Sequence, residues 1–277
     1  MFDPSESPGS RSAGYERVGN DLDGQLLGGT SMAGVRASSA AIVQLRDVVK
    51  IYNRSQRGLL GANLRVDRGE FVLITGASGA GKSTLLKLLY GEELVDRGAV
   101  VVDDSVVSEL NRRQLAMLRR KIGIVFQDYK LIPRRTVAEN IAFVLLAQGY
   151  SQTEIRRRLT PALRLVGLLH KADHFPEQLS GGEQQRASIA RAIVSTPPLI
   201  LADEPTGNLD GDNSQQIISI LERLNEFGAT TIVTTHDELW VRRSHHRVLQ
   251  LNEGKLYEVR PASNRVGDRP APAVWLG

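Results

Sequence analysis

Short runs of apolar and β-branched residues alternate, along most of the chain, with segments whose apolar residues have helical spacing. The runs cover residues 41–49, 71–75, 99–104, 122–127, 199–202, 230–235 and 247–251. Apolar strands with helices between them are typical of a buried, largely parallel sheet. The earliest and latest runs, with a hairpin-like turn at "NEGK" from Asn252, indicate antiparallel strands. The pattern therefore predicts an α/β fold with a mainly parallel sheet core and antiparallel strands at its margins.

A helical block interrupts this alternation. From about residue 129 to residue 196 no strand pattern occurs, and the apolar residues recur at helical spacing. The segments concerned are "VAENIAFVLLAQG", "SQTEIRRRLTPALRLVGLL" and "EQQRASIARAIVST". We expect a helical subdomain, at about residues 129–196, inserted into an α/β domain that spans residues 41–259.

The two ends of the chain differ from this domain in composition. Residues 1–40 are rich in Gly, Ser and Ala and have no apolar periodicity, which predicts a disordered N-terminal extension. Residues 260–277 are rich in proline and are expected to form a tail.

The composition is that of an ordinary globular protein, with 277 residues, 41% hydrophobic and 24% charged. The absence of cysteine excludes disulfides and thiolate metal sites. The longest apolar runs, such as residues 141–147, are too short to span a bilayer, and the first residues lack the apolar stretch of a signal peptide. These features predict a soluble protein of the cytoplasm.

Basic residues fall in clusters, for example at residues 119–121 and 156–158, and the formal net charge is +4. Solvated helix faces are one explanation of such clusters, and contact with anionic lipid or with an acidic partner surface is another. Nucleic acid is not expected as a partner, because aromatic residues make up only 5% of the chain and no recognition motif occurs.

A glycine-rich loop follows the predicted strand "FVLIT". The loop "GASGAGKST" matches G-x-x-x-x-G-K-[ST] and leads into the helical segment "LLKLLYG", which is the strand–loop–helix context that phosphate binding requires. Lys82 is expected to reach the β- and γ-phosphates of a nucleotide, and the Ser83 hydroxyl to ligate Mg²⁺. The residues expected to bind the nucleotide are Gly76, Ala77, Ser78, Gly79, Ala80, Gly81, Lys82, Ser83 and Thr84.

Polar residues at the ends of other predicted strands provide the remaining chemistry. Asp203, at the end of "LILAD", supplies a second hard oxygen ligand for Mg²⁺. Glu204 either caps the following helix or acts as general base for the attacking water, and its place beside the metal ligand favours the base. Gln127 and His236 end predicted strands too, so they face the crevice in which parallel sheets bind ligands.

A second motif, "LSGGEQQR", combines a helix start with two poor helix formers. Ser180 and Glu183 have the spacing of a capping box, yet Gly181 and Gly182 lie between them. The free N–H groups of a helix start attract anions, so bare glycines there indicate close approach of a phosphate. The alternative is a flexible loop that runs into a capped helix.

Together, "GASGAGKS", "FQ", "LSGGEQQR", "LADEP", "GNLD" and "THD" resemble, in order and spacing, the ABC-transporter-type ATPase cassette, a P-loop NTPase fold. The resemblance covers about residues 42–259 and implies ATP as substrate with Mg²⁺. It implies these roles: Ser180, Gly181, Gly182 and Glu183 form a signature motif, Gln127 the Q-loop, Asp210 the D-loop, His236 the switch histidine, and Tyr52 the aromatic that stacks on adenine. Glu204, His236 and Gln127 are then the catalytic residues, and Ser83, Gln127 and Asp203 the metal ligands.

The same resemblance implies a dimer. The chain has one phosphate-binding loop and one signature, so two copies must pair head to tail, and each signature contacts the γ-phosphate held by the other copy.

Within the ABC family, "LRRKIGIVFQDYKLIPRRTVAENIAF" and "ADEPTGNLD" are similar to the FtsE group of cell-division ATPases. This resemblance implies a homodimer in the ATP-bound state, bound on the cytoplasmic face of the membrane to an integral, FtsX-like partner. The chain departs from many cassettes at Asp104, where they have a glycine in a turn. Aspartate tolerates such turns, so the departure leaves the function unaffected.

Three other functions are compatible with parts of this pattern. A lipoprotein-release or macrolide-type exporter ATPase has the same chemistry and a different membrane partner. A soluble ABC protein of translation or DNA repair generally has two cassettes or a long coiled-coil insertion, and this chain has neither. A nucleotide-binding module without turnover is disfavoured because both Glu204 and His236 are present.

Overall fold

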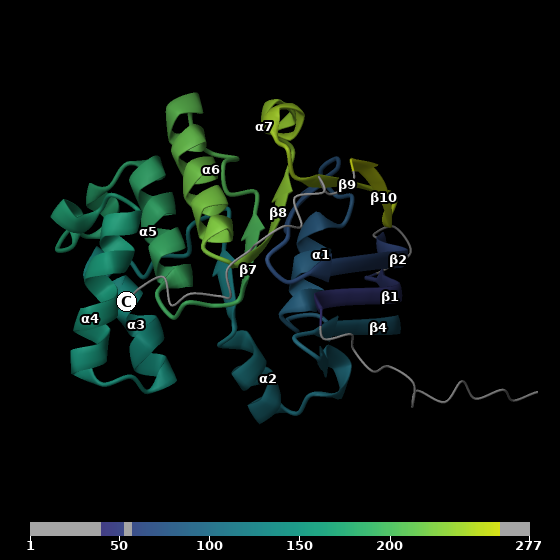
Figure 1. Cartoon of the computed structure of the whole chain (residues 1–277), viewed down its shortest axis with the longest axis horizontal. Helices are drawn as coiled ribbons and strands as arrows, with labels where there is room; N and C mark the ends of the chain where they lie inside the picture. Colours follow the sequence, from purple (N-terminus) through teal and green to yellow (C-terminus); the bar gives the residue numbers. More distant parts are fainter. Residues whose placement is uncertain (1–39, 53–56, 261–277) are drawn as a thin grey trace, which may run out of the picture. The chain divides into compact units, whose positions relative to one another are not determined.

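The computed structural model describes residues 40–52 and 57–260 (Figure 1). The expected N-terminal extension, and the tail beyond Arg260, lie outside the described residues.

A six-stranded sheet forms the centre of the domain, in the order β10-β9-β3-β8-β7-β6. Its strands are β3 (Phe71–Thr75), β6 (Ile122–Val125), β7 (Leu199–Asp203), β8 (Thr230–Thr235), β9 (Arg247–Asn252) and β10 (Lys255–Arg260). Strand β10 is antiparallel to β9, whereas the other pairs are parallel. The predicted parallel core is therefore confirmed, and its carboxyl ends lie along one edge. Strand β6 ends at Val125, two residues before Gln127.

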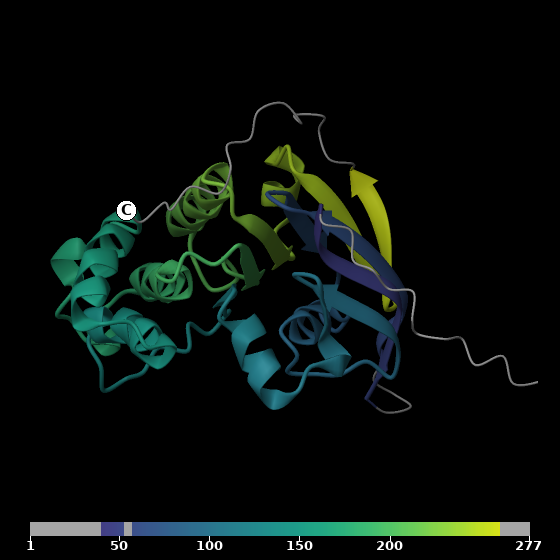
Figure 2. The ribbon, with the colours of Figure 1, turned by 60° about the horizontal axis from the view of Figure 1, so that its bottom comes forward.

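The early strands form a second sheet, with the order β2-β1-β4-β5 and only antiparallel pairs. Its strands are β1 (Ala41–Ile51), β2 (Arg57–Asp67), β4 (Arg97–Val102) and β5 (Ser105–Val106). The sequence pattern indicated antiparallel strands but not a separate sheet, and it placed residues 99–104 among the parallel strands. The N–H of Leu60 in β2 donates to the carbonyl of Gly254 beside β10, at 2.8 Å, which joins the two sheets (Figure 2).

Alternate residues along the central strands enter two different cores. In β3, Leu73 belongs to a cluster with the helical residues Ile141 and Ile189. Its neighbours Val72 and Ile74 belong to a cluster with helix α1 (Lys82–Leu89) and the small sheet. The middle of the central sheet is thus covered on both faces, which explains why β3 and β7 have almost continuous apolar sequences.

Further helices complete the α/β part of the domain. They are α1 (Lys82–Leu89), η1 (Val107–Glu109), α2 (Arg112–Arg119), α6 (Gly211–Glu226) and α7 (Glu238–Arg243). Among residues 40–52 and 57–260, no helix combines the length and the apolarity needed to cross a bilayer.

The turn between β4 and β5 contains the departure from the family at Asp104. Asp103 and Asp104 both have left-handed backbones, with φ of 46° and 61°. The Asp103 carboxylate accepts from Arg68 at 2.6 Å and from Lys121 at 2.7 Å. Burial raises the pKa of Asp103, but these two cations outweigh it, so the pKa lies below its usual value. The turn therefore forms without glycine, as expected.

Only helices lie between β6 and β7, as the pattern predicted. They are α3 (Val137–Gln148), α4 (Gln152–Leu165), η2 (Leu169–Lys171), η3 (Pro176–Gln178) and α5 (Gly181–Ile193). Helices α3, α4 and α5 pack on one another beside α6 (Figure 1, left). Each of the three begins with a capping box, which sets its first turn. Buried Asn140 fixes the preceding loop to α3 by bonding both the N–H and the carbonyl of Ile132.

Candidate functional site

The loop between β3 and α1 has the backbone that its glycines permit. Gly79 and Gly81 have φ of 79° and 109°, in the left-handed region. A Cβ at Gly81 would lie 2.2 Å from the carbonyl oxygen of Gly58, so no larger residue fits there. Helix α1 then starts at Lys82 without a side-chain cap, which leaves N–H groups of its first turn available to an anion.

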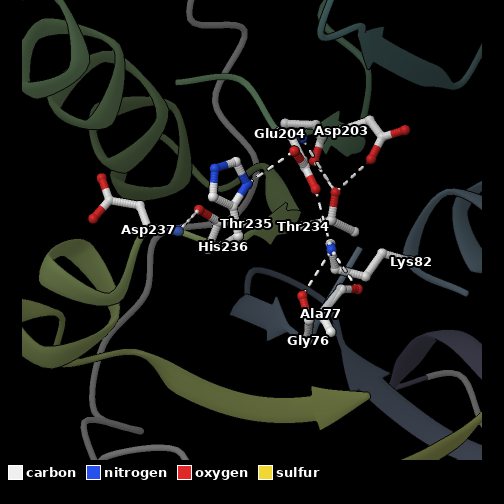
Figure 3. A network of polar contacts seen from close by, with 10 residues as sticks. Gly76, Ala77, Lys82, Asp203, Glu204, Thr234, Thr235, His236 and Asp237 are labelled. Carbon is white, nitrogen blue, oxygen red and sulfur yellow. Dashed lines mark hydrogen bonds and ion pairs between the residues drawn. The ribbon is translucent and has the colours of Figure 1, made fainter. Parts of the chain in front are cut away.

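Lys82 turns back over this loop and is only 5% exposed. Its Nζ donates to the carbonyls of Gly76 and Ala77, at 2.8 and 3.2 Å. A buried ammonium needs such partners because isolated charge is costly to bury. The contacts hold the positive charge beside the loop (Figure 3).

A cavity of about 490 Å³ opens above the loop. It is lined by Tyr52, Gly58, Ser78, Gly79, Gly81, Lys82, Ser83, Thr84, Lys87, Glu93, Gln127 and Glu204. Tyr52 follows β1 at the rim, with its hydroxyl 3.4 Å from Oγ1 of Thr84. The structure therefore brings Tyr52, Gln127 and Glu204 to the predicted phosphate-binding loop.

Glu204 connects two other site residues. Its backbone leaves the strand conformation, with φ of 44°, directly after β7. Its Oε1 lies 3.1 Å from Nζ of Lys82 and its Oε2 lies 2.9 Å from Nδ1 of His236 (Figure 3). Because an ionised carboxylate only accepts hydrogen bonds, the second contact places a proton on Nδ1 of His236.

Asp203 is held separately from Glu204. Its Oδ1 accepts a hydrogen bond of 2.6 Å from the hydroxyl of Thr234 on the neighbouring strand β8 (Figure 3). Thr234 also receives the N–H of Glu204, at 3.2 Å. This buried threonine thus positions the carboxylate of Asp203 and the backbone of Glu204. Sequence reasoning missed Thr234, although it lies two residues before His236 in "TTIVTTHD".

Gly207 marks the point at which these residues meet. A Cβ on Gly207 would lie 3.4 Å from Nε2 of Gln127, 3.4 Å from the carbonyl oxygen of Glu204 and 3.6 Å from Cε1 of His236. The side chains of Gln127 and His236 and the backbone of Glu204 therefore lie close to Gly207, in the loop that follows β7. They come from three different strand ends, which adjoin because the strands are parallel.

The signature segment begins α5 with the expected capping box. The N–H of Glu183 donates to Oγ of Ser180 at 3.3 Å, and the N–H of Ser180 donates to Oε2 of Glu183 at 2.9 Å. The second bond is the main cause of a lowered pKa at Glu183. Of the described residues that line the nucleotide cavity, none belongs to this segment. The signature and the phosphate-binding loop of one chain thus lie at different places.

The two glycines of the signature have neighbours within the chain. A Cβ on Gly182 would lie 2.0 Å from Oδ1 of Asn213, and a Cβ on Gly181 would lie 3.1 Å from the hydroxyl of Tyr129. From the sequence, both glycines indicated an approaching phosphate, with a flexible loop before a capped helix as the alternative. The structure adds a second reason, because a side chain at Gly182 would force Asn213 out of its place.

Asn213 lies at the centre of this packing. Its Nδ2 donates to both carboxylate oxygens of Asp210, at 3.0 and 2.9 Å, and its N–H donates to Oδ1 at 2.8 Å. Its Oδ1 accepts from Nη1 of Arg186 on α5, at 3.2 Å. The bonds from Asn213 hold the pKa of Asp210 below its usual value. Asp210, the predicted D-loop residue, is the N-cap of α6.

The loop after β6 is fixed to the other end of α5. Tyr129 and Lys130 have left-handed backbones, with φ of 59° and 51°. Their carbonyls accept from the guanidinium of Arg191, at 2.8 and 2.5 Å. Neither Tyr129 nor Asn213 has a sequence signal of its own, because both roles depend on how distant elements pack.

These features define a nucleotide-binding ATPase domain: a phosphate-binding loop, a carboxylate pair after a buried parallel strand, and a capped helix with bare glycines. The ABC transporter family matches residues 59–207. The chain belongs to that family and is an ABC-type ATPase.

Individual relatives and a solved structure are similar to the chain over most of its length. The cell division ATP-binding protein FtsE of Streptococcus pneumoniae is 46% identical over 216 residues, covering 78% of this chain and 94% of that protein. FtsE of Escherichia coli K12 is 44% identical, covering 78% and 97%. Among solved structures, the dimeric ATP-binding cassette MJ0796 in a post-hydrolysis state bound to ADP and Pi has a TM-score of 0.72. It is 38% identical and covers 79% of this chain and 99% of that one. The predicted family and cassette fold are confirmed.

The contact between Gly182 and Asn213 yields a prediction. We expect Gly182→Ala to destabilise the monomer, because overpacking costs about 1–3 kcal/mol. The helix preference of alanine returns at most about 1 kcal/mol. Adding Asn213→Ala should recover part of the loss, so the two effects should not be additive in urea unfolding. Additive effects, or a stabilised Gly182→Ala variant, would contradict the packing explanation.

Proposed function

We propose that this chain is the ATP-hydrolysing subunit of a membrane complex that acts in cell division, resembling FtsE, with Glu204 as the catalytic base. The observation that carries the catalytic part is the carboxylate of Glu204 at the nucleotide cavity, in contact with both Lys82 and His236. The similarity to FtsE cell-division proteins of several bacteria supports the cell-division part.

The contacts support a division of tasks among the side chains. The phosphates of ATP compete with Glu204 for the ammonium of Lys82, because both are anions. Glu204, once released from Lys82, accepts the proton of the attacking water. His236 holds the second oxygen of Glu204 and thereby keeps the carboxylate oriented. Tyr52, at the rim, supplies an aromatic face for the base of the nucleotide.

The residues present fit a magnesium ion. Among the described residues no group of three or more His, Cys, Asp or Glu could hold a metal by itself. Mg²⁺ in nucleotide sites needs only one or two carboxylates or hydroxyls, because the phosphates supply other ligands. Ser83 and Gln127 line the cavity, and Asp203 lies at the end of β7. A bound Mg²⁺ would neutralise charge on the phosphates.

Two copies are needed to complete the sites. Ser180, Gly181 and Gly182 do not line the cavity of their own chain, yet they offer a capped helix N-terminus to an anion. The dimeric cassettes among the similar structures support the same arrangement. ATP would then close the dimer, and hydrolysis would open it.

A membrane partner receives the conformational change that ATP binding and hydrolysis cause in the dimer. By the FtsE resemblance this partner is an integral, FtsX-like protein, and the chain is attached through it to the cytoplasmic face of the membrane. Control of cell-wall hydrolysis is the expected output, rather than carriage of a substrate. The identity of the co-purifying membrane protein distinguishes this function from that of an exporter ATPase.

Replacement of the base tests the chemistry. Glu204→Gln should retain ATP affinity and lower turnover by about 10²–10⁴-fold, the usual contribution of a positioned acid–base group. Steady-state phosphate release at saturating Mg²⁺ and ATP measures it. Turnover equal to that of the unchanged protein would assign Glu204 a structural role.

Replacement of the signature serine tests the two-copy site. Glu204→Gln should accumulate an ATP-bound dimer, visible by sedimentation, and Ser180→Arg added to it should abolish that dimer. The monomer's ATP affinity should change by about 1 kcal/mol or less. Ser151→Arg is a matched control, because Ser151 forms the equivalent capping box on α4. A dimer that survives Ser180→Arg, or that is lost equally with Ser151→Arg, argues against the arrangement.

Attachment to the membrane tests the partner. In cells lacking the membrane partner the protein should fractionate with the soluble material, and in cells containing it with the membranes. Replacing exposed Arg156 and Arg157 by Gln should increase release by salt, since basic side chains near an anionic surface contribute about 1 kcal/mol each. Complete membrane retention at high salt without the partner is the contrary outcome.

A further inference from the structure

Side chains of α5 and α6 hold the two ends of the loop from Glu204 to Asp210. At the first end, buried Gln185 donates to the carbonyl of Pro205 at 2.8 Å. At the other end, Asn213 binds Asp210 and accepts from Arg186. The loop begins with the carboxylate that contacts Lys82, and it ends against the first turn of the signature helix.

We propose that Asn213 is a positioning residue, which fixes the first turn of α5 relative to the loop that carries Glu204. The proposal rests on the proposed function, because it joins the catalytic loop of one site to the signature that serves the other. Asn213 itself does not line the nucleotide cavity. It acts through Asp210, Gly182 and Arg186.

The chemistry of the amide suits this role. A short amide donates through its nitrogen and accepts through its oxygen at the same time. Here the nitrogen serves the carboxylate of Asp210, and the oxygen serves the guanidinium of Arg186. An aspartate at position 213 could still accept from Arg186 but would set a second carboxylate against Asp210. An alanine would lose both contacts.

The close approach to Gly182 makes the connection stiff. A Cβ there would lie 2.0 Å from Oδ1 and 2.4 Å from Cγ of Asn213. Leu209, in the same loop, lies 3.7 Å from the corresponding position at Gly181. A shift of the loop is therefore passed to the first turn of α5 through the side chain of Asn213, which both Asp210 and the contact at Gly182 hold in place.

A simpler role for Asn213 is helix capping alone. Asp210 caps α6 by accepting the backbone N–H of residue 213, which any residue except proline supplies. Capping therefore needs no side chain at position 213. The side-chain amide adds two bonds to the same carboxylate. If support of this cap were its whole role, loss of the amide would affect only the start of α6 and leave α5 unchanged.

Hydrogen exchange of the full-length monomer separates these roles. Asn213→Ala and Asn213→Asp are compared with Ser219→Ala, an exposed position on the same helix whose hydroxyl donates only to Gln215. We expect several-fold faster exchange, in both Asn213 variants, at the amides of Glu183 and Gln184 on α5 as well as at Ser214 on α6. Faster exchange confined to Ser214 would overturn the proposal.

A second measurement uses the Glu204→Gln protein with Mg²⁺ and ATP. Adding Asn213→Ala should weaken the ATP-dependent dimer about tenfold, as expected for the loss of a hydrogen bond to a charged group. ATP affinity of the monomer should stay within about twofold. An unchanged dimer constant would also overturn the proposal. If Glu204→Gln alone forms no dimer, the two-copy site is wrong, and the exchange at Glu183 and Gln184 then decides the role of Asn213.

Discussion

The buried charge of Lys82 is the constraint on which the site depends. A 5% exposed ammonium requires oxygen partners, and the chain supplies two loop carbonyls and the carboxylate of Glu204. To bring Glu204 there, β7 must lie close to β3 with its carboxyl end at the same edge. The sheet order places β8 between them, and the residue after β8 is His236. The ion pair, the contact with the histidine and the parallel sheet are therefore parts of one arrangement.

Helix α5 contacts two of the loops that carry these site residues. Its first turn meets Asn213 and the loop after β7, and its last turn meets the loop after β6 through Arg191. Both loops lead to residues at the nucleotide cavity, Glu204 in one case and Gln127 in the other. A single helix thus contacts both loops, and its first turn carries the two glycines of the signature segment.

The sequence predicted the elements whose residues are apolar on both faces. Strand β3 was expected at the residues where it occurs, and β7 within one residue, because a central strand covered on two sides has a continuous apolar run. Strand β2 was missed because buried Ala62, Leu64 and Val66 alternate with exposed residues, which halves the apolar signal. Motif spacing predicted several of the residues that line the cavity, among them Lys82, Gln127 and Glu204. It could not predict Thr234, Tyr129 or Asn213, because their contacts arise from strand pairing and helix packing between distant segments.

The close contact at Gly182 also limits what the signature motif indicates about ATP hydrolysis. A chain that had lost ATP hydrolysis would still favour glycine at this position, because a side chain there would displace Asn213 from its contacts with Asp210 and Arg186. Selection for folding alone would then preserve half of the signature's glycine pair. In related chains, retention of this glycine is therefore evidence of an intact helix junction. Evidence of turnover has to come from positions such as Glu204, whose carboxylate the packing of these helices does not require.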